Sequence, residues 1–251
     1  MRLVRLDGGS AKDLLAGEGP GPGAILGHVA GTGHGRAWVD RWPHPSAVLA
    51  EVAGNYLLAG SPSAVDPVAL RPLVTGFLAA PEAFAPVVAD AFPDRVAWDR
   101  VVYRLPAGPG IPPPRVPAEM RALASADADA IAGLGPELGW VAKTWGGPAG
   151  LAGGGHAYGT FVDGRLVAAA GTFFLGHRYE DAFAVTEPRW RGRGLATACA
   201  RAWCAGVVAR GRTPTWTTSP DNHGSHRIAE RLGMVLVRRD VLHVIGVDPP
   251  A

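Results

Sequence analysis

The residues with the clearest capacity for chemistry lie at 184–197, with the sequence AVTEPRWRGRGLAT. A predicted strand ends before Pro188, and the following Arg-Gly-Arg-Gly turn leads directly into a predicted helix. The first turn of a helix carries unpaired N–H groups and the positive end of the helix dipole. The glycines let a ligand approach the backbone closely, and the arginines add positive charge. We therefore expect this turn to bind a diphosphate through backbone donors.

Two familiar phosphate-binding motifs do not fit this turn. A P-loop is excluded because no Gly-Lys-Ser/Thr follows, and the dinucleotide fingerprint is excluded because the third glycine is missing. An Arg/Gly surface loop remains the alternative interpretation. A second glycine cluster within residues 20–35 lacks the strand–turn–helix context and is predicted to be an ordinary loop.

The hydrophobic patterns predict an α/β (α+β) protein with two domains joined by a linker. The linker is the proline-rich segment 105–117, LPAGPGIPPPRVP, which cannot continue a helix or a central strand. Residues 1–104 are predicted to form a smaller N-terminal α/β domain with strands at 36–40, 55–59 and 95–104 and helices at 66–80 and 82–92. Residues 118–251 form the second domain, in which an Asp163-Gly164 hairpin turn joins two strands.

The second domain has a clearer order of elements. Helices are predicted at 125–135, 136–145, 194–210 and 225–232, and strands at 156–162, 165–175, 178–187, 213–218, 234–239 and 241–246.

These motifs resemble a known family. Arg191-x-x-Gly194-x-Ala196 is similar to the acyl-CoA-binding signature of the GNAT superfamily of N-acetyltransferases, and the order of elements over 120–246 is similar too. Downstream, Asn222-x-x-Ser225 and Leu232-Gly233-Met234 resemble the superfamily's Asn…Leu-Gly-Phe block. Short phrases such as Pro214-x-Trp216 more particularly resemble the zwittermicin-resistance-like branch, which also carries an N-terminal extension.

The resemblance implies a cofactor site. It implies a GNAT fold with a central mixed, mostly antiparallel, splayed sheet flanked by helices, and acetyl-CoA or another acyl-CoA as co-substrate without a metal. The backbones of Phe183 and Val185 would pair with the pantetheine arm, and the Val185 N–H would polarise the thioester carbonyl. Asn222 and Ser225 would face the pantetheine or the sulfur. The diphosphate would be held by N–H groups of Arg191, Gly192, Arg193, Gly194, Leu195 and Ala196, with the hydroxyl of Thr197 beside them.

Transfer to an amine also needs a proton acceptor, because most alkyl amines are protonated at pH 7. The candidates on the third predicted strand are His177, Glu180 and Asp181, of which Glu180 and Asp181 rank equally. Strand alternation places Asp181 on the face of Val185 and Glu180 on the other face, and a bulge would change this assignment. A family position that often carries a tyrosine acid corresponds to Ala229, so Ser225 or a water is the candidate acid.

The acceptor is expected where the first helices meet the sheet. Trp140, Lys143 and Trp145 lie in this region, and tryptophan rings can wall a pocket or bind a cation. Ordinary core packing is the alternative for both tryptophans. His223 and His226 are three residues apart, but a metal site needs further ligands that the sequence does not supply nearby.

Composition limits the classes of partner. Of the 251 residues, 47% are hydrophobic and 18% charged, with a net charge of +2 and no clustered basic stripe, which argues against nucleic acid. A signal peptide and an apolar run of membrane-spanning length are both missing, so we expect a cytoplasmic protein with no membrane partner. Cys199 and Cys204 are expected to be buried thiols and not a disulfide.

The sequence therefore predicts an acetyl-CoA-dependent N-acetyltransferase acting by direct attack of a primary amine of a small molecule, such as a natural product or antibiotic. The alternatives are an acyltransferase using a different acyl-CoA and a non-catalytic CoA-binding regulatory module. Residues 1–104 could serve as a degenerate GNAT-like copy, as a lid, or as the contact of a homodimer.

Overall fold

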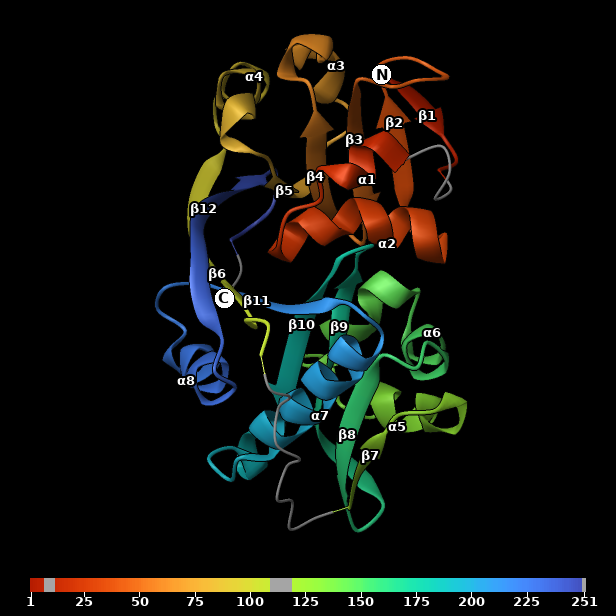
Figure 1. Ribbon diagram of the computed structural model, residues 1–251, viewed down its shortest axis with the longest axis vertical. Helices are drawn as coiled ribbons and strands as arrows, with labels where there is room; N and C mark the ends of the chain where they lie inside the picture. Colours follow the sequence, from red (N-terminus) through yellow and green to blue (C-terminus); the bar gives the residue numbers. More distant parts are fainter. Residues whose placement is uncertain (7–11, 109–118, 250–251) are drawn as a thin grey trace.

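The computed structural model describes residues 1–6, 12–108 and 119–249, and its centre is one continuous sheet of 12 strands (Figure 1). The order across the sheet is β1-β2-β3-β4-β5-β12-β6-β11-β10-β9-β8-β7. The strands are β1 (Arg2–Val4), β2 (Arg36–Val39), β3 (Ala47–Val52), β4 (Asn55–Gly60), β5 (Gly76–Ala79), β6 (Val96–Arg104), β7 (Glu119–Ala122), β8 (Ala157–Val162), β9 (Arg165–Leu175), β10 (Tyr179–Thr186), β11 (Thr213–Thr218) and β12 (Val235–Ile245).

Helices pack against both faces of this sheet. The α-helices are α1 (Lys12–Ala16), α2 (Ile25–Thr32), α3 (Pro67–Leu70), α4 (Ala85–Ala91), α5 (Ala128–Ala132), α6 (Pro148–Gly153), α7 (Leu195–Ala209) and α8 (His223–Arg231). The 3-10 segments are η1 (Gly21–Ala24), η2 (Pro62–Ala64), η3 (Glu82–Phe84), η4 (Ser125–Asp127), η5 (Gly139–Trp145) and η6 (Pro188–Trp190). Within the described ranges, none of these helices combines the length and the apolar character that a bilayer crossing requires.

The two halves of the chain, residues 1–104 and 119–249, repeat one topology. In each half four strands lie in the order β1-β2-β3-β4 or β7-β8-β9-β10 with antiparallel pairing, and a fifth strand joins them in parallel. The fifth strands are β5 and β11. Each half then ends with a helix, α4 or α8, and a long final strand.

The final strands are exchanged between the halves. β6 closes the first half in sequence, yet it pairs with β11 of the second half, and β12 returns to pair with β5 of the first. β6 and β12 also pair with each other from Val96↔Val244 to Arg104↔Val235. The long β6–β12 ribbon at the left of Figure 1 therefore joins the halves into one sheet.

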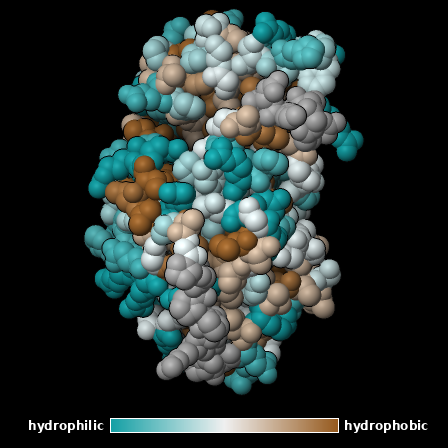
Figure 2. Space-filling view, in the orientation of Figure 1, coloured by the Kyte–Doolittle hydropathy of each residue, from teal (hydrophilic) through white to brown (hydrophobic). Residues whose placement is uncertain are grey.

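This exchange changes the expected boundary between domains, because the strand predicted at 95–104 hydrogen-bonds to the second half. Leu105 continues the contact, and its N–H donates to the carbonyl of Pro214 at 3.0 Å. Residues 109–117 of the predicted linker lie outside the described residues. Over β12, hydrophobic residues reach the surface (Figure 2), where Val235, Leu236 and Val237 are exposed.

Several predictions for the first half were wrong. The predicted loop at 20–35 contains α2, whose Gly27 lies so close to Gly176 that a Cβ would come within 2.8 Å of the Gly176 Cα. The glycine is therefore a packing residue inside a helix. The predicted helix at 66–80 is the short α3 followed by β5, and strand β3 was not predicted. In the second half, the two strands predicted at 234–239 and 241–246 are the single strand β12, with a register shift between Leu236 and Arg238.

Hydrogen bonds with side chains of the first half hold the turn between β9 and β10. The buried carboxylate of Glu18 accepts the backbone N–H groups of His177, Arg178 and Tyr179 at 2.7, 3.1 and 3.0 Å. His28 of α2 contacts the Thr144 carbonyl at 2.8 Å and accepts the Leu175 N–H at 3.0 Å. Burial lowers the pKa of His28 to about 4, so it stays neutral and can accept that N–H.

Candidate active site

The sheet of the second half opens between β10 and β11. These parallel strands pair only from Tyr179↔Thr213 to Asp181↔Thr215, and beyond this point they separate. A register shift between Asp181 and Ala182 interrupts the pairing of β10 with β9 at the same place. A cavity of about 660 Å³ occupies the opening, a volume typical of small-molecule sites.

Many of the predicted site residues line this cavity together. They are Trp140, Val185, Arg191, Gly192, Gly194, Leu195, Ala196, Thr197, Asn222 and Ser225. The cavity has further lining residues that no sequence motif indicated, which are Glu137, Leu138, Ala184, Thr186, Trp190, Trp216, Gly224, Arg227, Ile228 and Arg231. Phe183, Arg193, Lys143, Trp145, Glu180 and Asp181 are not among the lining residues.

The cradle, which is the turn that the sequence predicts to bind a diphosphate, leads directly into α7. Gly192 and Gly194 have φ angles of 76° and 77°, in the left-handed region, and a Cβ at either position would meet open space. Gly194 is the N-cap of α7, and no side chain caps this helix. The N–H groups of the first turn are therefore open to an anion. The guanidinium of Arg193 stacks over the Trp190 ring at 4.5 Å from its centroid, outside the cavity.

The backbone groups that face the opening differ from the expectation by one residue. The Glu187 N–H donates to the Val167 carbonyl on β9 at 2.9 Å, and the β10–β9 register runs without a shift from Thr186 back to Ala182. Alternate residues of an antiparallel ladder face the same neighbour, so Phe183 and Val185 hydrogen-bond toward β9. The backbones of Ala184 and Thr186 face the opening instead. Accordingly, the Thr186 carbonyl accepts from Arg191 Nε at 3.3 Å.

The start of α8 forms the opposite wall of the cavity. The Asn222 side chain caps this helix, with Oδ1 accepting the Ser225 N–H at 3.0 Å. The Ser225 hydroxyl accepts the Trp216 Nε1–H at 2.7 Å, which leaves its own proton free to be donated. Ala229 is fully buried among apolar residues.

Arg227 and Arg231 add charge to this wall, one turn apart on α8. Their i, i+4 spacing places both side chains on one face of the helix. This spacing was visible in the sequence and was the signal that could have identified them.

Asp181 lies at the closed end of the opening, on the face covered by η1. Its Oδ1 accepts the hydroxyls of Thr215 at 2.8 Å and Thr217 at 3.1 Å, and the described residues form no hydrogen bond with Oδ2. Burial raises the pKa of Asp181 to about 6, although the two hydroxyls lower it. A carboxylate with one anchored and one free oxygen, and with a pKa near neutrality, is suited to accept a proton.

Glu180 lies on the opposite face and is fully paired. Its carboxylate accepts from Arg210 at 2.9 and 3.0 Å, lies 3.4 Å from Arg212, and accepts the hydroxyl of Thr172. His156 Nδ1 lies 3.4 Å from Oε2, at ion-pair distance but without a formed hydrogen bond. Burial alone would raise the pKa of Glu180, but the contacts with His156, Arg210 and Thr172 outweigh it and lower the pKa to about 2.

The three predicted acceptor residues lie in different environments. Trp140 is 38% exposed and packs edge-on against Phe173 and Phe183 beside the cavity. Trp145 is buried, stacks on His156, and donates Nε1–H to the Thr172 carbonyl at 2.7 Å, so it is a core residue. Lys143 is exposed.

The side chain of His226 forms a hydrogen bond within the chain, with Nδ1 2.8 Å from the Tyr103 hydroxyl. Over the ranges that the structure describes, no group of three His, Cys, Asp or Glu side chains could hold a metal ion.

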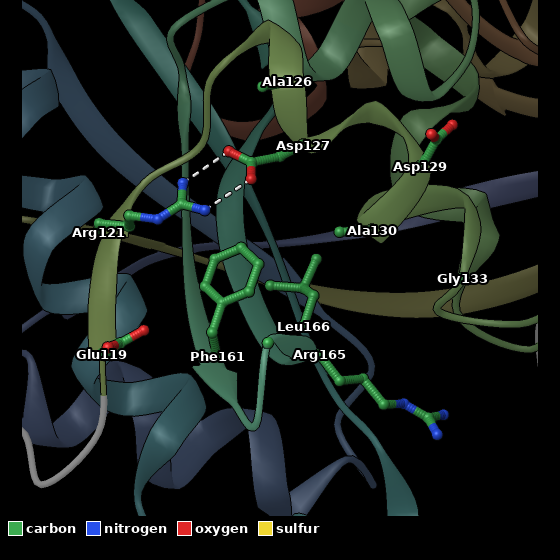
Figure 3. A pocket seen from close by; sticks show the side chains of 11 residues that line it. Glu119, Arg121, Ala126, Asp127, Asp129, Ala130, Gly133, Phe161, Arg165 and Leu166 are labelled. Carbon is green, nitrogen blue, oxygen red and sulfur yellow. Dashed lines mark hydrogen bonds and ion pairs between the residues drawn. The ribbon is translucent and has the colours of Figure 1, made fainter.

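A second cavity, of about 650 Å³, lies between α5 and the β8–β9 hairpin (Figure 3). Arg121 and Asp127 point toward one another and form two hydrogen bonds of 2.7 Å, above the apolar floor of Phe161 and Leu166. Arg165 points away and pairs with Glu187. Because its arginines are already paired with carboxylates, this cavity does not offer a ready anion site.

Comparison with known proteins identifies the family. A family model described as GNAT acetyltransferase matches residues 138–239, which contain the cradle and both walls of the cavity. An uncharacterised N-acetyltransferase of Streptomyces virginiae is 41% identical over 194 residues, 76% of this chain and 81% of that protein. The chain belongs to the GNAT family of N-acetyltransferases. It is an acetyltransferase enzyme of a family that uses acetyl-CoA.

Solved structures share the fold over both halves. A GCN5-related N-acetyltransferase-like protein of Streptococcus suis superposes with a TM-score of 0.68 at 18% identity, covering 93% of this chain and 96% of that one. A tandem GNAT protein from the clavulanic acid biosynthesis pathway superposes with a TM-score of 0.56 at 15% identity, covering 96% and 97%. These likenesses show that this chain shares its mixed α/β fold with both solved structures.

Proposed function

We propose that this enzyme transfers the acetyl group of acetyl-CoA to the primary amine of a small molecule by direct attack of the amine. The observation that carries this proposal is the uncapped start of α7, where Gly192 and Gly194 expose backbone N–H groups at the end of the opening between β10 and β11.

The cavity fits the parts of acetyl-CoA. The amides of residues 191–196 suit the diphosphate, with the Thr197 hydroxyl beside them. The backbones of Ala184 and Thr186 would pair with the pantetheine arm as an added strand. Bound acetyl-CoA supplies the acetyl group as a thioester, and the Ala184 N–H is the donor placed to polarise its carbonyl.

We assign the proton acceptor to Asp181. Asp181 is buried and does not line the cavity, so its Oδ2 would take the proton from the acceptor nitrogen through a water. General bases of this kind contribute about 10²- to 10⁴-fold to the rate. Glu180 is unsuited to this role because its carboxylate is ionised and bound on all sides. Ser225, oriented by Trp216, is placed to donate a proton toward the leaving sulfur.

Coverage by the first half favours a small acceptor. η1 packs against β9, β10 and β11 on the face where Asp181 lies, and α2 packs against β9. Trp140 remains the exposed aromatic wall beside the cavity. A covered site of this kind suits a small molecule better than a segment of a folded protein, and the tandem protein from the clavulanic acid pathway is a precedent from natural-product biosynthesis.

Of the two helices that precede the fifth strand of each half, only α7 starts without a side-chain cap among the described residues. The equivalent helix of the first half is α3, with four residues. Its N1 residue, Pro67, has no N–H, and the Asp66 carboxylate accepts the Val68 N–H at 2.9 Å. A carboxylate thus occupies the position that a phosphate would need, so we propose one acetyl-CoA per chain.

The test is turnover of the purified chain with acetyl-CoA and a panel of small primary amines, monitored by release of free thiol. Acetylated amine should be found by mass spectrometry in an amount equal to the thiol. Longer acyl-CoA thioesters in the same assay test the acyl preference. Tight acetyl-CoA binding without amine-dependent thiol release across a broad panel would instead support the regulatory alternative.

A further inference from the structure

The hydroxyl of Thr215 connects the first half of the chain to Asp181. Thr215 lies on β11 and is fully buried. Its Oγ1 accepts the backbone N–H of Gly21 at 3.2 Å, and lies 2.8 Å from Asp181 Oδ1 and 3.2 Å from the Glu180 carbonyl oxygen. Gly21 precedes Thr215 by 194 positions in the sequence.

This arrangement satisfies Asp181 in both protonation states. A hydroxyl has one proton to donate, and the ionised carboxylate is the stronger acceptor. When Asp181 is protonated, the Thr215 hydroxyl can turn to the Glu180 carbonyl and accept from the new acid. In both states the Gly21 N–H remains donated to Oγ1. A side chain that must gain and lose a proton in each turnover needs partners of this kind.

The position of the Gly21 N–H requires glycine. The φ of Gly21 is +73°, and a Cβ there would lie 2.8 Å from Thr217 Oγ1 and 3.0 Å from Val102 Cγ1. Thr217 is the second hydroxyl bound to Asp181. An added methyl group would therefore displace a donor of the same carboxylate.

The segment that precedes Gly21 makes two contacts with the second half. Glu18 binds the turn that leads into β10. Arg238 of β12 donates to the Pro20 carbonyl at 3.2 Å. The hydrogen bond from the Gly21 N–H to Thr215 Oγ1 is therefore held in place by neighbouring contacts and is not a loose surface contact.

Other charges around Asp181 come from the exchanged strands. Arg100 of β6 forms an ion pair of 3.0 Å with Asp240 of β12, and Arg238 binds the other oxygen of Asp240. Arg100 favours the ionised form of Asp181, whereas Asp240 opposes it. Thr215, Thr217 and the Gly21 backbone contribute no net charge, so they act through hydrogen bonds alone.

We propose that Gly21 and Thr215 are positioning residues through which the first half of the chain sets the orientation and the proton affinity of Asp181. Through this hydrogen bond, the Gly21 N–H of the first half becomes part of the catalytic site of the second half. This proposal rests on the proposed function in one respect, which is that Asp181 is the general base.

The test is the pKa of the Asp181 carboxyl, measured by ¹³C NMR titration of the full chain labelled at aspartate, with Asp181→Asn used to assign the signal. Thr215→Val removes a donor to the carboxylate and should raise this pKa by about one unit. Thr215→Ser should restore it. Thr213→Val is the matched control, since its side chain makes no hydrogen bond with the described residues, and it should leave the pKa unchanged. An unchanged pKa in Thr215→Val would overturn the proposal.

Gly21→Ala tests the contribution of the first half. It should raise the same pKa and move the acid limb of the kcat/KM profile to higher pH, while acetyl-CoA affinity stays at the wild-type value. Gly23→Ala, where a Cβ meets open space, is its control. If Gly21→Ala kept the wild-type pKa of Asp181 and the wild-type kcat/KM profile, the first half would have no part in setting that pKa. Full turnover by Asp181→Asn would refute the base assignment alone, because the NMR pKa does not depend on turnover.

Discussion

Adjacent carboxyl groups of β10 have opposite environments. Burial would raise the pKa of Glu180, but its contacts with His156 and Arg210 lower it to about 2, whereas burial raises the pKa of Asp181 to about 6. The sequence could name both residues but could not rank them, because the bulge between Asp181 and Ala182 and the arginine partners from the end of α7 are features of the folded chain. The structure separates a paired structural carboxylate from a candidate base.

Substitution of these two residues should change stability in opposite directions. At pH 7, ionised Asp181 is disfavoured in the folded state, so Asp181→Asn should increase the free energy of unfolding, by at most about 3 kcal/mol. Glu180→Gln leaves Arg210 and Arg212 without their partner and should decrease it by about 3 kcal/mol. Urea unfolding at pH 7 measures both.

The pH dependence of these effects follows from the two shifts. The gain from Asp181→Asn should disappear below about pH 4, where Asp181 is protonated in both the folded and unfolded states. The loss from Glu180→Gln should decrease as the pH falls from about 4.5 toward 2, where Glu180 becomes protonated in the folded state as well. Destabilisation by both substitutions to the same extent at pH 7 would contradict the distinction between the two carboxyls.

Turnover should depend on the ionisation of Asp181. The acid limb of the kcat/KM profile should therefore rise with pH through an apparent pKa of about 6. Asp181→Asn should lower kcat by about 10²-fold or more and remove this limb. A limb that persists unchanged in Asp181→Asn belongs to another group.

At the scale of elements, the second half was largely predictable. The strand–turn–helix at 184–197 is visible because Pro188 follows the end of β10 and Gly194 is the N-cap of α7. The sequence did not show which backbone groups of β10 bond to β9 and which face the opening. The side chains alternate with a period of two in either case, and only the Glu187–Val167 hydrogen bond distinguishes the two arrangements. The first half was harder to predict, because α2 contains Gly27, which its close contact with Gly176 requires. Glycine has a low helix propensity, so the sequence argued against a helix there.

Arg227 and Arg231 give α8 a testable role in cofactor binding. Both line the cavity on the wall opposite the cradle, where they can pair with the phosphate groups of CoA. Arg227→Ala with Arg231→Ala should weaken CoA binding by about tenfold at low salt, which corresponds to about 1.4 kcal/mol. The loss should be smaller for dephospho-CoA if the ribose phosphate is their partner. Equal affinity of the variant and the wild type for CoA would exclude this role.

The whole molecule depends on an exchange that no local pattern reveals. β6 and β12 read as ordinary strands, but which strand each one joins is decided by pairing across more than 100 positions. The proline-rich segment suggested two domains joined by a linker. The continuous sheet shows instead that each half lends its last strand to the other.

The exchange predicts that neither half is stable alone. A fragment of residues 109–251 lacks β6, so β11 is left as an open edge and β12 loses its partners on both sides. Expressed alone, it should show no cooperative thermal transition, and co-expression with residues 1–108 should restore one. A cooperative transition and CoA binding by 109–251 alone would contradict the structural dependence of the second half on the first.

Isothermal titration of the full chain with acetyl-CoA tests the central claim most directly. Binding should follow one site per chain, because the open amides of α7 have no counterpart at α3. Gly194→Val, which forces a β-branched residue into a left-handed conformation, should reduce the affinity at least tenfold, whereas Gly164→Ala in the distant hairpin should retain it. Failure of the wild-type chain to bind acetyl-CoA, or binding of two equivalents, would contradict the account.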